Sequence, residues 1–434
     1  MKKIITLMLA AVMLFSVSGC KSNDTLTNSS AEEIVEVEEI VIDQTGSQLT
    51  SSSDNTASDG LSQNDNSTSQ GSESSEESDG SSIVIDYDTV VEVDICDEII
   101  RLYLDAVDPK KQYTFLSQYG NLMLDYQSLP LEWKSDGSHT YTVYISENAD
   151  FSNAYIMDTS VNKADKTGIC VPGKTYYWKV MGVYSDEALA GGKIKIKDAP
   201  VRWVKLDGVN NVRDMGGWKT ESGKTVNYEK IYRGAQLDKI TSKGLNTLKA
   251  LGMKTDIDVR STASWDTHSA VERTGLKYYF FDSGYSYEAI LNEYIETIGP
   301  NLQELFKLLD DESNYPIYLH CGGGTDRTGT YAFILNGLLG VSYEDLTRDY
   351  ELTSYAGADR WRGNGTGGTF APDDLIHENV SNSQEDASWG VLNKKFMESK
   401  YCTDGKLSTA IQNFLLDRGV TQAQIDKFKE IMLK

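Results

Sequence analysis

Residues 314–329 read NYPIYLHCGGGTDRTG, in which an apolar run ends at His320 and a glycine-rich turn leads on to Arg327. The apolar run has the composition of a buried strand, and the residues from Thr328 to Leu339 have that of a helix. Further strand-like and helix-like segments alternate on both sides of this stretch. The pattern predicts an α/β domain with a parallel-type central sheet over residues 201–434.

The turn between this strand and helix has the composition of an anion-binding loop. Three consecutive glycines, Gly322, Gly323 and Gly324, allow the backbone to curl so that its N–H groups point inward. The N-terminus of the following helix adds positive potential, and Arg327 offers a planar fork for two oxygens of an oxyanion. Cys321 lies six positions before that arginine. We therefore expect a thiol of lowered pKa that faces the same anion as the guanidinium.

The residues beside the cysteine and the glycines also have expected roles. Thr328 is placed to donate a hydrogen bond to the sulfur and to help it leave after a covalent step. Thr325 and Asp326 complete the set that surrounds the anion. His320 is expected to orient the loop by hydrogen bonding, since a cysteine that is already a thiolate needs no base.

This Cys-x5-Arg pattern, with His before it and Thr-Gly after it, resembles the signature of the protein tyrosine phosphatase superfamily. The segments 208–217, 232–235 and 256–261 resemble successive segments of bacterial tyrosine phosphatases that include secreted and lipoprotein members. Together the similar segments extend from about residue 205 to 345. The resemblance implies hydrolysis of phosphate monoesters, above all protein phosphotyrosine, through a phosphocysteine intermediate. It implies no cofactor.

One position departs from the pattern of these bacterial enzymes. In that group a lysine commonly stands where this chain has Thr325, and the lysine is associated with phosphoinositide binding. Activity on inositol phosphates or phosphoinositides, as in cysteine phytases, is therefore an alternative that this position disfavours. An alternative of another class is a non-catalytic surface-binding lipoprotein, which the intact Cys321, Asp326 and Arg327 disfavour.

Two aspartates compete for the role of general acid. In the resembling bacterial group an aspartate at the position of Asp326 is the proposed acid. Asp282 follows the predicted strand 276–281, where dual-specificity phosphatases carry their mobile acid. We favour Asp326 and keep Asp282 as the alternative. Asp214 and Arg260 are expected to support the site as members of structural ion pairs, as is Arg213.

Charge and histidine spacing restrict the partners. The chain has 41 basic and 65 acidic residues, a net charge of −24, which argues against binding a nucleic-acid backbone. Residues 21–82 hold fourteen Asp or Glu against one Lys, so this charge says little about the α/β domain. The four histidines are scattered and none has metal-ligand spacing, so no metal site is predicted.

The N-terminal part predicts export and a lipid anchor. A basic head, an apolar run and a small residue before Cys20 resemble a bacterial lipoprotein signal peptide over residues 1–20, with Cys20 as the lipidated residue. Residues 21–82 are rich in Ser, Asp and Glu and predict a disordered stalk. The protein is then anchored to a membrane outside the cytoplasm and acts on a phosphorylated protein or a small phosphorylated substrate.

Residues 83–200 predict an all-β module. Strand patterns at 141–145 and 175–180, with a turn at Pro172-Gly173, resemble a fibronectin type III or immunoglobulin-like sandwich. Its binding partner is not predicted. Cys96 and Cys170 either form a disulfide or remain buried free thiols. At the other end of the chain, residues 407–433 predict two helices separated at Gly419.

Overall fold

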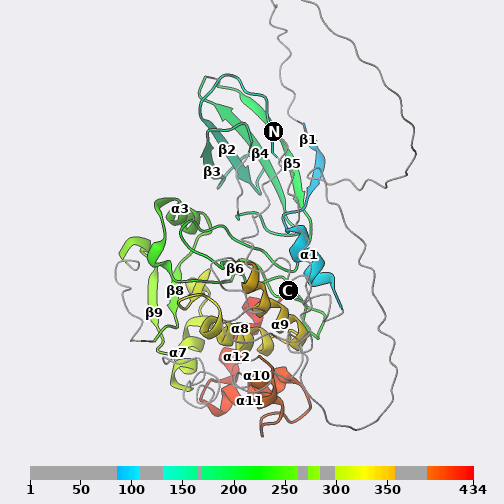
Figure 1. Cartoon of the computed structure of the whole chain (residues 1–434), viewed down its shortest axis with the longest axis vertical. Coiled ribbons are helices and arrows are strands. Elements are labelled where there is room, and N and C mark those ends of the chain that lie inside the picture. The colour runs from blue at the N-terminus through cyan, green and yellow to red at the C-terminus, as the bar shows by residue number, and fades with distance from the viewer. Residues whose placement is uncertain are drawn as a thin grey trace, which may run out of the picture. The chain divides into compact units, whose positions relative to one another are not determined.

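The computed structural model describes residues 86–107, 131–163, 168–184, 186–261, 272–283, 299–356 and 389–434 (Figure 1). The predicted signal peptide at 1–20, with Cys20, and the predicted stalk at 21–82 lie outside the described residues. Within the described ranges, no helix is both long and apolar enough to cross a membrane.

The described residues of the N-terminal half include a five-stranded sheet, in the order β1-β5-β4-β2-β3. The strands are β1 (Asp86–Val93), β2 (Tyr141–Ser146), β3 (Tyr155–Thr159), β4 (Thr175–Gly182) and β5 (Ala188–Ile196). β5, β4, β2 and β3 are antiparallel neighbours, whereas β1 runs parallel to β5. β2 and β4 confirm the two predicted strands. The second sheet of the sandwich stays a prediction.

A helix, α1 (Glu98–Asp105), follows β1 in a stretch for which the sequence predicts only strands. Its N-cap Asp97 accepts a hydrogen bond from the backbone of Ile99, and its buried face belongs to the core of the C-terminal domain. Cys96 lies in that same core, but Cys170 lies in the core of the first sheet. Both are buried free thiols, which is the second of the two predicted alternatives.

The C-terminal domain is built on a second five-stranded sheet, in the order β6-β7-β10-β8-β9. The strands are β6 (Arg213–Asp214), β7 (Ile231–Gly234), β8 (Thr255–Asp258), β9 (Lys277–Phe280) and β10 (Ile317–His320). β7, β10, β8 and β9 are parallel, as predicted, and only the short edge strand β6 is antiparallel. The sheet is therefore mixed.

Helices cover both faces of this sheet, so every residue of β7, β8 and β10 is buried, the polar ones included. Ile317 and Leu319 of β10 pack in a core formed with most of the helices, and Tyr318 packs on the opposite face beside Leu248 of α3. The helices are α3 (Ser242–Ala250), α7 (Gly299–Leu309), α8 (Asp326–Leu338), α9 (Tyr343–Glu351), α10 (Trp389–Met397), α11 (Leu407–Asp417) and α12 (Gln422–Met432). Short 3-10 helices occupy Leu237–Lys239, Glu312–Asn314 and Leu352–Tyr355.

The two C-terminal helices end and begin as predicted. Gly419, with φ of +87°, follows α11, and Thr421 caps α12 in a reciprocal capping box with Gln424. The helix predicted after the central strand is α8, which begins two residues earlier than expected.

The order of the strands places the predicted site. β10 is the central strand and has parallel partners on both sides, so its carboxyl end lies at the middle of one sheet edge. Loops at this edge are where open α/β sheets bind ligands. His320 is the last residue of β10, and the glycine-rich turn follows it directly.

Candidate active site

The anion loop, residues 321–327, joins the end of β10 to the first turn of α8. Gly324 has φ of +68°, and a Cβ atom added there would lie 2.3 Å from the carbonyl group of Gly234 at the end of β7. Glycine is therefore required both for the backbone conformation and for the close approach of the neighbouring strand.

Four successive carbonyl groups of the anion loop accept hydrogen bonds from outside it. The bonds run from Gln236 N to Gly322 O (3.2 Å), from Asn211 Nδ2 to Gly323 O (3.1 Å), and from Arg233 Nη2 to Gly324 O (3.0 Å) and Thr325 O (3.2 Å). In a planar trans peptide the C=O and N–H groups point in opposite directions. The N–H groups of residues 323–326 are therefore turned to the inner side of the loop, as an anion nest requires.

Cys321 is buried at the start of the anion loop, and its environment favours the thiolate. Burial acts to raise the thiol pKa, but the hydroxyl and backbone N–H of Thr328 and the charge of Arg327 outweigh it, so the pKa of Cys321 is lowered. The carboxylate of Asp326 acts in the opposite direction. The hydroxyl of Thr328 makes no other hydrogen bond among the described residues, which agrees with the role expected for it.

Arg327 has an unused donor in the site. Its Nη1 atom is buried and has no hydrogen-bond partner among the described residues. An unpaired buried donor destabilises the folded chain, and a bound ligand that supplies an acceptor removes this cost. Arg327 and the inward N–H groups together fit a tetrahedral oxyanion in front of the Cys321 sulfur.

His320 is fully buried between the anion loop and β8. Its Nε2 lies 3.0 Å from Asp256 Oδ1, and its Nδ1 lies 3.1 Å from the carbonyl oxygen of Cys321. Burial disfavours the imidazolium, but Asp256 outweighs it and, with Asp258, raises the pKa of His320 to about 9. A protonated His320 forms an ion pair with Asp256 through Nε2 and donates from Nδ1 to the carbonyl of Cys321, as expected of a residue that orients the loop.

The two candidate acids have different surroundings. Asp326 begins α8, and its Oδ1 accepts a hydrogen bond of 2.9 Å from the hydroxyl of Tyr350 on α9. Its charge reaches the Cys321 thiol. Asp282 is exposed just after β9, and its carbonyl oxygen accepts a hydrogen bond from Asn301 at 2.9 Å. Asp326 therefore lies in the anion loop itself, whereas Asp282 belongs to a different segment of the chain.

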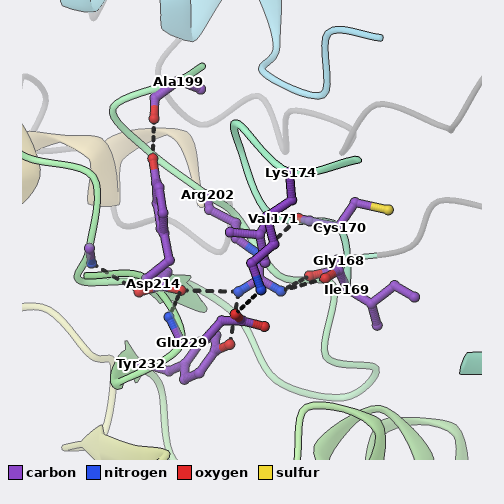
Figure 2. A network of polar contacts seen from close by, with 12 residues as sticks. Gly168, Ile169, Cys170, Val171, Lys174, Ala199, Arg202, Asp214, Glu229 and Tyr232 are labelled. Carbon is purple, nitrogen blue, oxygen red and sulfur yellow. Dashed lines mark hydrogen bonds and ion pairs between the residues drawn. The ribbon is translucent and has the colours of Figure 1, made fainter. Parts of the chain in front are cut away.

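Asp214 is fully buried, and it binds Arg202 instead of the anion loop. Its Oδ2 lies 3.0 Å from Arg202 Nη1, which also donates to the hydroxyl of Tyr232 at 2.8 Å. Figure 2 shows that the same guanidinium reaches the carbonyl groups of residues 168–170 on the other side. The expectation of an ion-pair role for Asp214 agrees with this geometry.

Arg260 also lies in a buried ion-pair cluster and supports the anion loop through an intermediate residue. It binds Asp258 through two hydrogen bonds of 3.0 Å and one of 2.8 Å, and it binds Asp238 at 2.9 Å. Its Nη1 donates to the side chain of Gln236, whose backbone N–H holds the carbonyl of Gly322. Arg260 thus stabilises the end of β8 beside the loop.

Thr325 contributes a hydroxyl, and no cation, to the anion loop. Its side chain is buried, and Oγ1 donates a hydrogen bond of 3.3 Å to the carbonyl of Gly323. The side chain therefore turns back onto its own loop.

Several residues that hold the loop had no assigned role in the sequence analysis. Asn211, Arg233 and Asp256 lie inside the segments that resemble the bacterial enzymes, which was the only signal available for them. Asp349 lies in an ordinary amphipathic helix far along the chain and carried no signal. Within the described residues, no group of His, Cys, Asp or Glu is arranged to hold a metal ion.

Comparisons with known proteins agree on the C-terminal part. The sequence model described as the tyrosine phosphatase family matches residues 204–434. A protein of Cupriavidus necator, named provisionally as a tyrosine-protein phosphatase, is 23% identical over 168 residues, which cover 33% of this chain and 60% of that protein. A tyrosine-protein phosphatase of Nostoc commune is 26% identical over 140 residues, covering 28% of this chain and 48% of that protein. The chain thus spans less than two thirds of these relatives.

Two solved structures are among those that match part of the chain. The catalytic core of the PP-IP phosphatase Siw14 from S. cerevisiae, in complex with citrate, has a TM-score of 0.24 at 17% identity, and the match covers 31% of this chain and 79% of that chain. TpbA from P. aeruginosa, in complex with pTyr, has a TM-score of 0.24 at 15% identity, covering 35% of this chain and 87% of that chain.

Proposed function

Because the chain belongs to the tyrosine phosphatase family, we propose that it hydrolyses phosphate monoesters, with protein phosphotyrosine as its main substrate. The observation that carries the proposal is the arrangement around Cys321. One loop combines a buried thiol of lowered pKa, an unused donor of Arg327 and four inward N–H groups. This arrangement suits a nucleophile and a bound phosphoryl group.

In the first proposed step, the Cys321 thiolate attacks phosphorus and the bond from phosphorus to the ester oxygen breaks. Asp326 gives its proton to the leaving oxygen, so the alcohol departs neutral. Arg327 and the N–H groups hold the phosphoryl oxygens while charge develops. The product on the enzyme is a phosphocysteine.

In the second proposed step, water attacks phosphorus, the Asp326 carboxylate accepts a proton from that water, and the bond between phosphorus and sulfur breaks. The hydroxyl of Thr328 stabilises the departing thiolate of Cys321. Inorganic phosphate is released and the enzyme returns to its starting state. Asp282, which is exposed just after β9, is the alternative acid.

The substrate preference is argued from Thr325. A polyphosphorylated inositol carries several negative charges, which additional cations would neutralise. Position 325 presents a hydroxyl bonded within its own loop, so the anion loop itself supplies only Arg327 as a cationic side chain. This supports a substrate with a single phosphate, and the inositol phosphates remain the alternative substrates.

Steady-state hydrolysis by the purified full-length chain tests the proposal. Phosphotyrosine peptide, phosphoserine peptide, phosphoinositide and phytate are compared in parallel with a metal chelator present. We expect turnover, fastest on phosphotyrosine peptide, and its loss in Cys321→Ser. Cys402→Ser, which changes a free thiol outside the anion loop, is the matched control and should retain full turnover.

The outcomes separate the alternatives. Faster turnover of phytate or phosphoinositide than of phosphotyrosine peptide would replace the proposed substrate and keep the mechanism. A folded chain without turnover on all four substrates would favour a binding lipoprotein in place of an enzyme.

The proposal extends to location. The sequence around Cys20 supports a lipid anchor outside the cytoplasm, followed by an acidic stalk that carries the domains away from the membrane. Metabolic labelling with a fatty acid tests it. We expect label on the wild-type chain and none on Cys20→Ser, and equal labelling of both would overturn it.

A further inference from the structure

Four buried polar side chains form a cluster behind the anion loop, on the side opposite to the expected phosphate. We call it the loop-support cluster; it consists of Asn211, Arg213, Arg233 and Asp349. Each is at most 4% exposed, and Arg213 and Arg233 are among the largest fully buried side chains of the described chain. Burying two guanidinium groups costs desolvation energy, and an apolar core of the same volume is often as stable. Stability alone therefore does not explain why these two arginines are buried here.

Asp349 of α9 joins the two arginines of the loop-support cluster. Its Oδ1 accepts from Arg213 Nε at 2.9 Å and its Oδ2 accepts from Arg233 Nη1 at 2.5 Å. Burial acts to raise the pKa of Asp349, but the two guanidinium groups outweigh it and hold the pKa below its usual range. The three side chains therefore carry two positive charges and one negative charge.

Two members of the cluster bind the anion loop directly. Arg233 donates through one nitrogen to the carbonyls of both Gly324 and Thr325, and Asn211 donates to the carbonyl of Gly323. Arg213 holds Asn211 in place through a bond of 2.5 Å to its Oδ1. The cluster thus reaches three successive peptide groups of the loop from behind.

We propose that the loop-support cluster positions the anion loop: by binding these carbonyl oxygens it directs the N–H groups of residues 324–326 at the phosphate and at the Cys321 sulfur. The inference rests on the proposed function of that loop. Arg233 and Asn211 are positioning residues, since they act through the backbone and do not touch the substrate. Asp349 holds the side chain of Arg233 in place, and Arg213 holds that of Asn211.

Loss of a member of the cluster would act on the groups that face the Cys321 sulfur. They are Thr328 and Arg327, which favour the thiolate, and Asp326, which opposes it. All three follow the loop carbonyls that the cluster holds. Release of those carbonyls therefore lets the loop amides and the start of α8 turn away from the sulfur, which raises the thiol pKa.

The test uses Arg233→Met in the full-length chain with two readouts that need no turnover. The thiol pKa is obtained from the pH dependence of iodoacetamide alkylation at Cys321, followed by mass spectrometry. The affinity for inorganic phosphate is obtained by calorimetry. We expect the thiol pKa to rise by about one unit and phosphate binding to weaken by about tenfold, the value of one good hydrogen bond.

Arg202→Met is the matched control, because Arg202 is an equally buried arginine in a comparable polar network that does not contact the anion loop (Figure 2). We expect it to lower the melting temperature and to leave both the thiol pKa and phosphate affinity unchanged. Equal shifts in both variants would show a general loosening of the fold and overturn the proposal.

Two further variants complete the test. Asn211→Gly removes the donor to Gly323 without changing charge and accepts the φ of +60° found there, so it also serves if Arg233→Met does not fold. We expect its thiol pKa to rise. Arg233→Lys keeps the charge but not the fork, and full rescue of both readouts would show a charge effect instead of positioning. Unchanged readouts in Arg233→Met and Asn211→Gly would overturn the proposal even if the chain proved an active phosphatase.

Discussion

The reactivity assigned to Cys321 depends on neighbours that oppose one another. Burial raises the thiol pKa, whereas Thr328 and Arg327 lower it by more. These neighbours lie within seven residues of the cysteine, so their types could be read from the sequence. The direction of their bonds could not, because it is set by contacts to the loop carbonyls from Asn211, which precedes β6, and from Arg233 of β7.

Thr325 should decide how strongly the site discriminates against polyphosphorylated substrates. In Thr325→Lys a cation is added beside the phosphate, and we expect kcat/KM for phytate relative to phosphotyrosine peptide to rise by about tenfold. Thr325→Met, which is also long and unbranched but neutral, is the control. A similar rise in both variants would assign the effect to the lost hydroxyl and not to charge.

His320 should make stability depend on pH in a defined window. Its pKa is about 9 in the folded chain and 6.5 when unperturbed, so its stabilising contribution is complete below pH 6.5 and is lost as the pH rises through 9. The loss is on the order of 3 kcal/mol. Urea unfolding of the wild type and of His320→Asn at pH 6 and pH 10 measures it. Parallel behaviour of the two proteins would contradict the prediction.

Among the elements, α1 is the one whose position was least predictable. It lies between strands of the first sheet in sequence, yet its Tyr103 is fully buried against α9 and the 3-10 helix 352–355 of the C-terminal domain. The Tyr103 hydroxyl donates to Glu351 Oε2 at 2.5 Å. A short amphipathic segment carries no signal for which of two domains its apolar face will join.

Glu351 of α9, which binds Tyr103 of α1, should make the stability of the folded chain fall as pH rises. Burial raises the pKa of Glu351 to about 8, although Tyr103 and Arg348 act to lower it, so ionisation is unfavourable in the folded chain. Stability should fall between pH 4.5 and 8 by on the order of 4 kcal/mol. Glu351→Gln removes this dependence while keeping an acceptor for Tyr103. The difference in unfolding free energy between the wild type and Glu351→Gln is measured at pH 5 and at pH 8.5. The same difference at both pH values would contradict the prediction.

At the scale of the whole described chain, Arg202 connects the first sheet's loop at residues 168–170 to Asp214 and Tyr232 of the second (Figure 2). Removal of one partner of a buried ion pair leaves the other uncompensated. Arg202→Met should therefore lower the free energy of unfolding by about 3–5 kcal/mol, measured by urea denaturation.

Lys174 provides the control for this connection. It also joins Glu147 to Glu229 by ion pairs of 2.8 and 2.6 Å, but all three side chains are partly exposed. Lys174→Met should cost less than about 1 kcal/mol. A loss of less than that value in Arg202→Met as well would show that the buried network contributes no more than a surface pair.

The order of residues alone was enough to predict the local frame of the site: a strand, a glycine loop with Cys321 and Arg327, a helix N-terminus, and the capped helices at the C-terminus. Interactions between residues that are close in sequence form these features, so they can be predicted from spacing and side-chain type. The sequence also carries the signals for export and for the stalk, which remain predictions.

The residues that support this frame became known from the folded chain. β10 lies between β7 and β8, which are much earlier in the chain, because burial of apolar residues on both faces selects the order of the strands. That order brings Arg233 and Asn211 to the loop, and the packing of α9 brings Asp349. Buried polar groups need partners in space, whatever their separation in sequence, and no local pattern records which residue will be near.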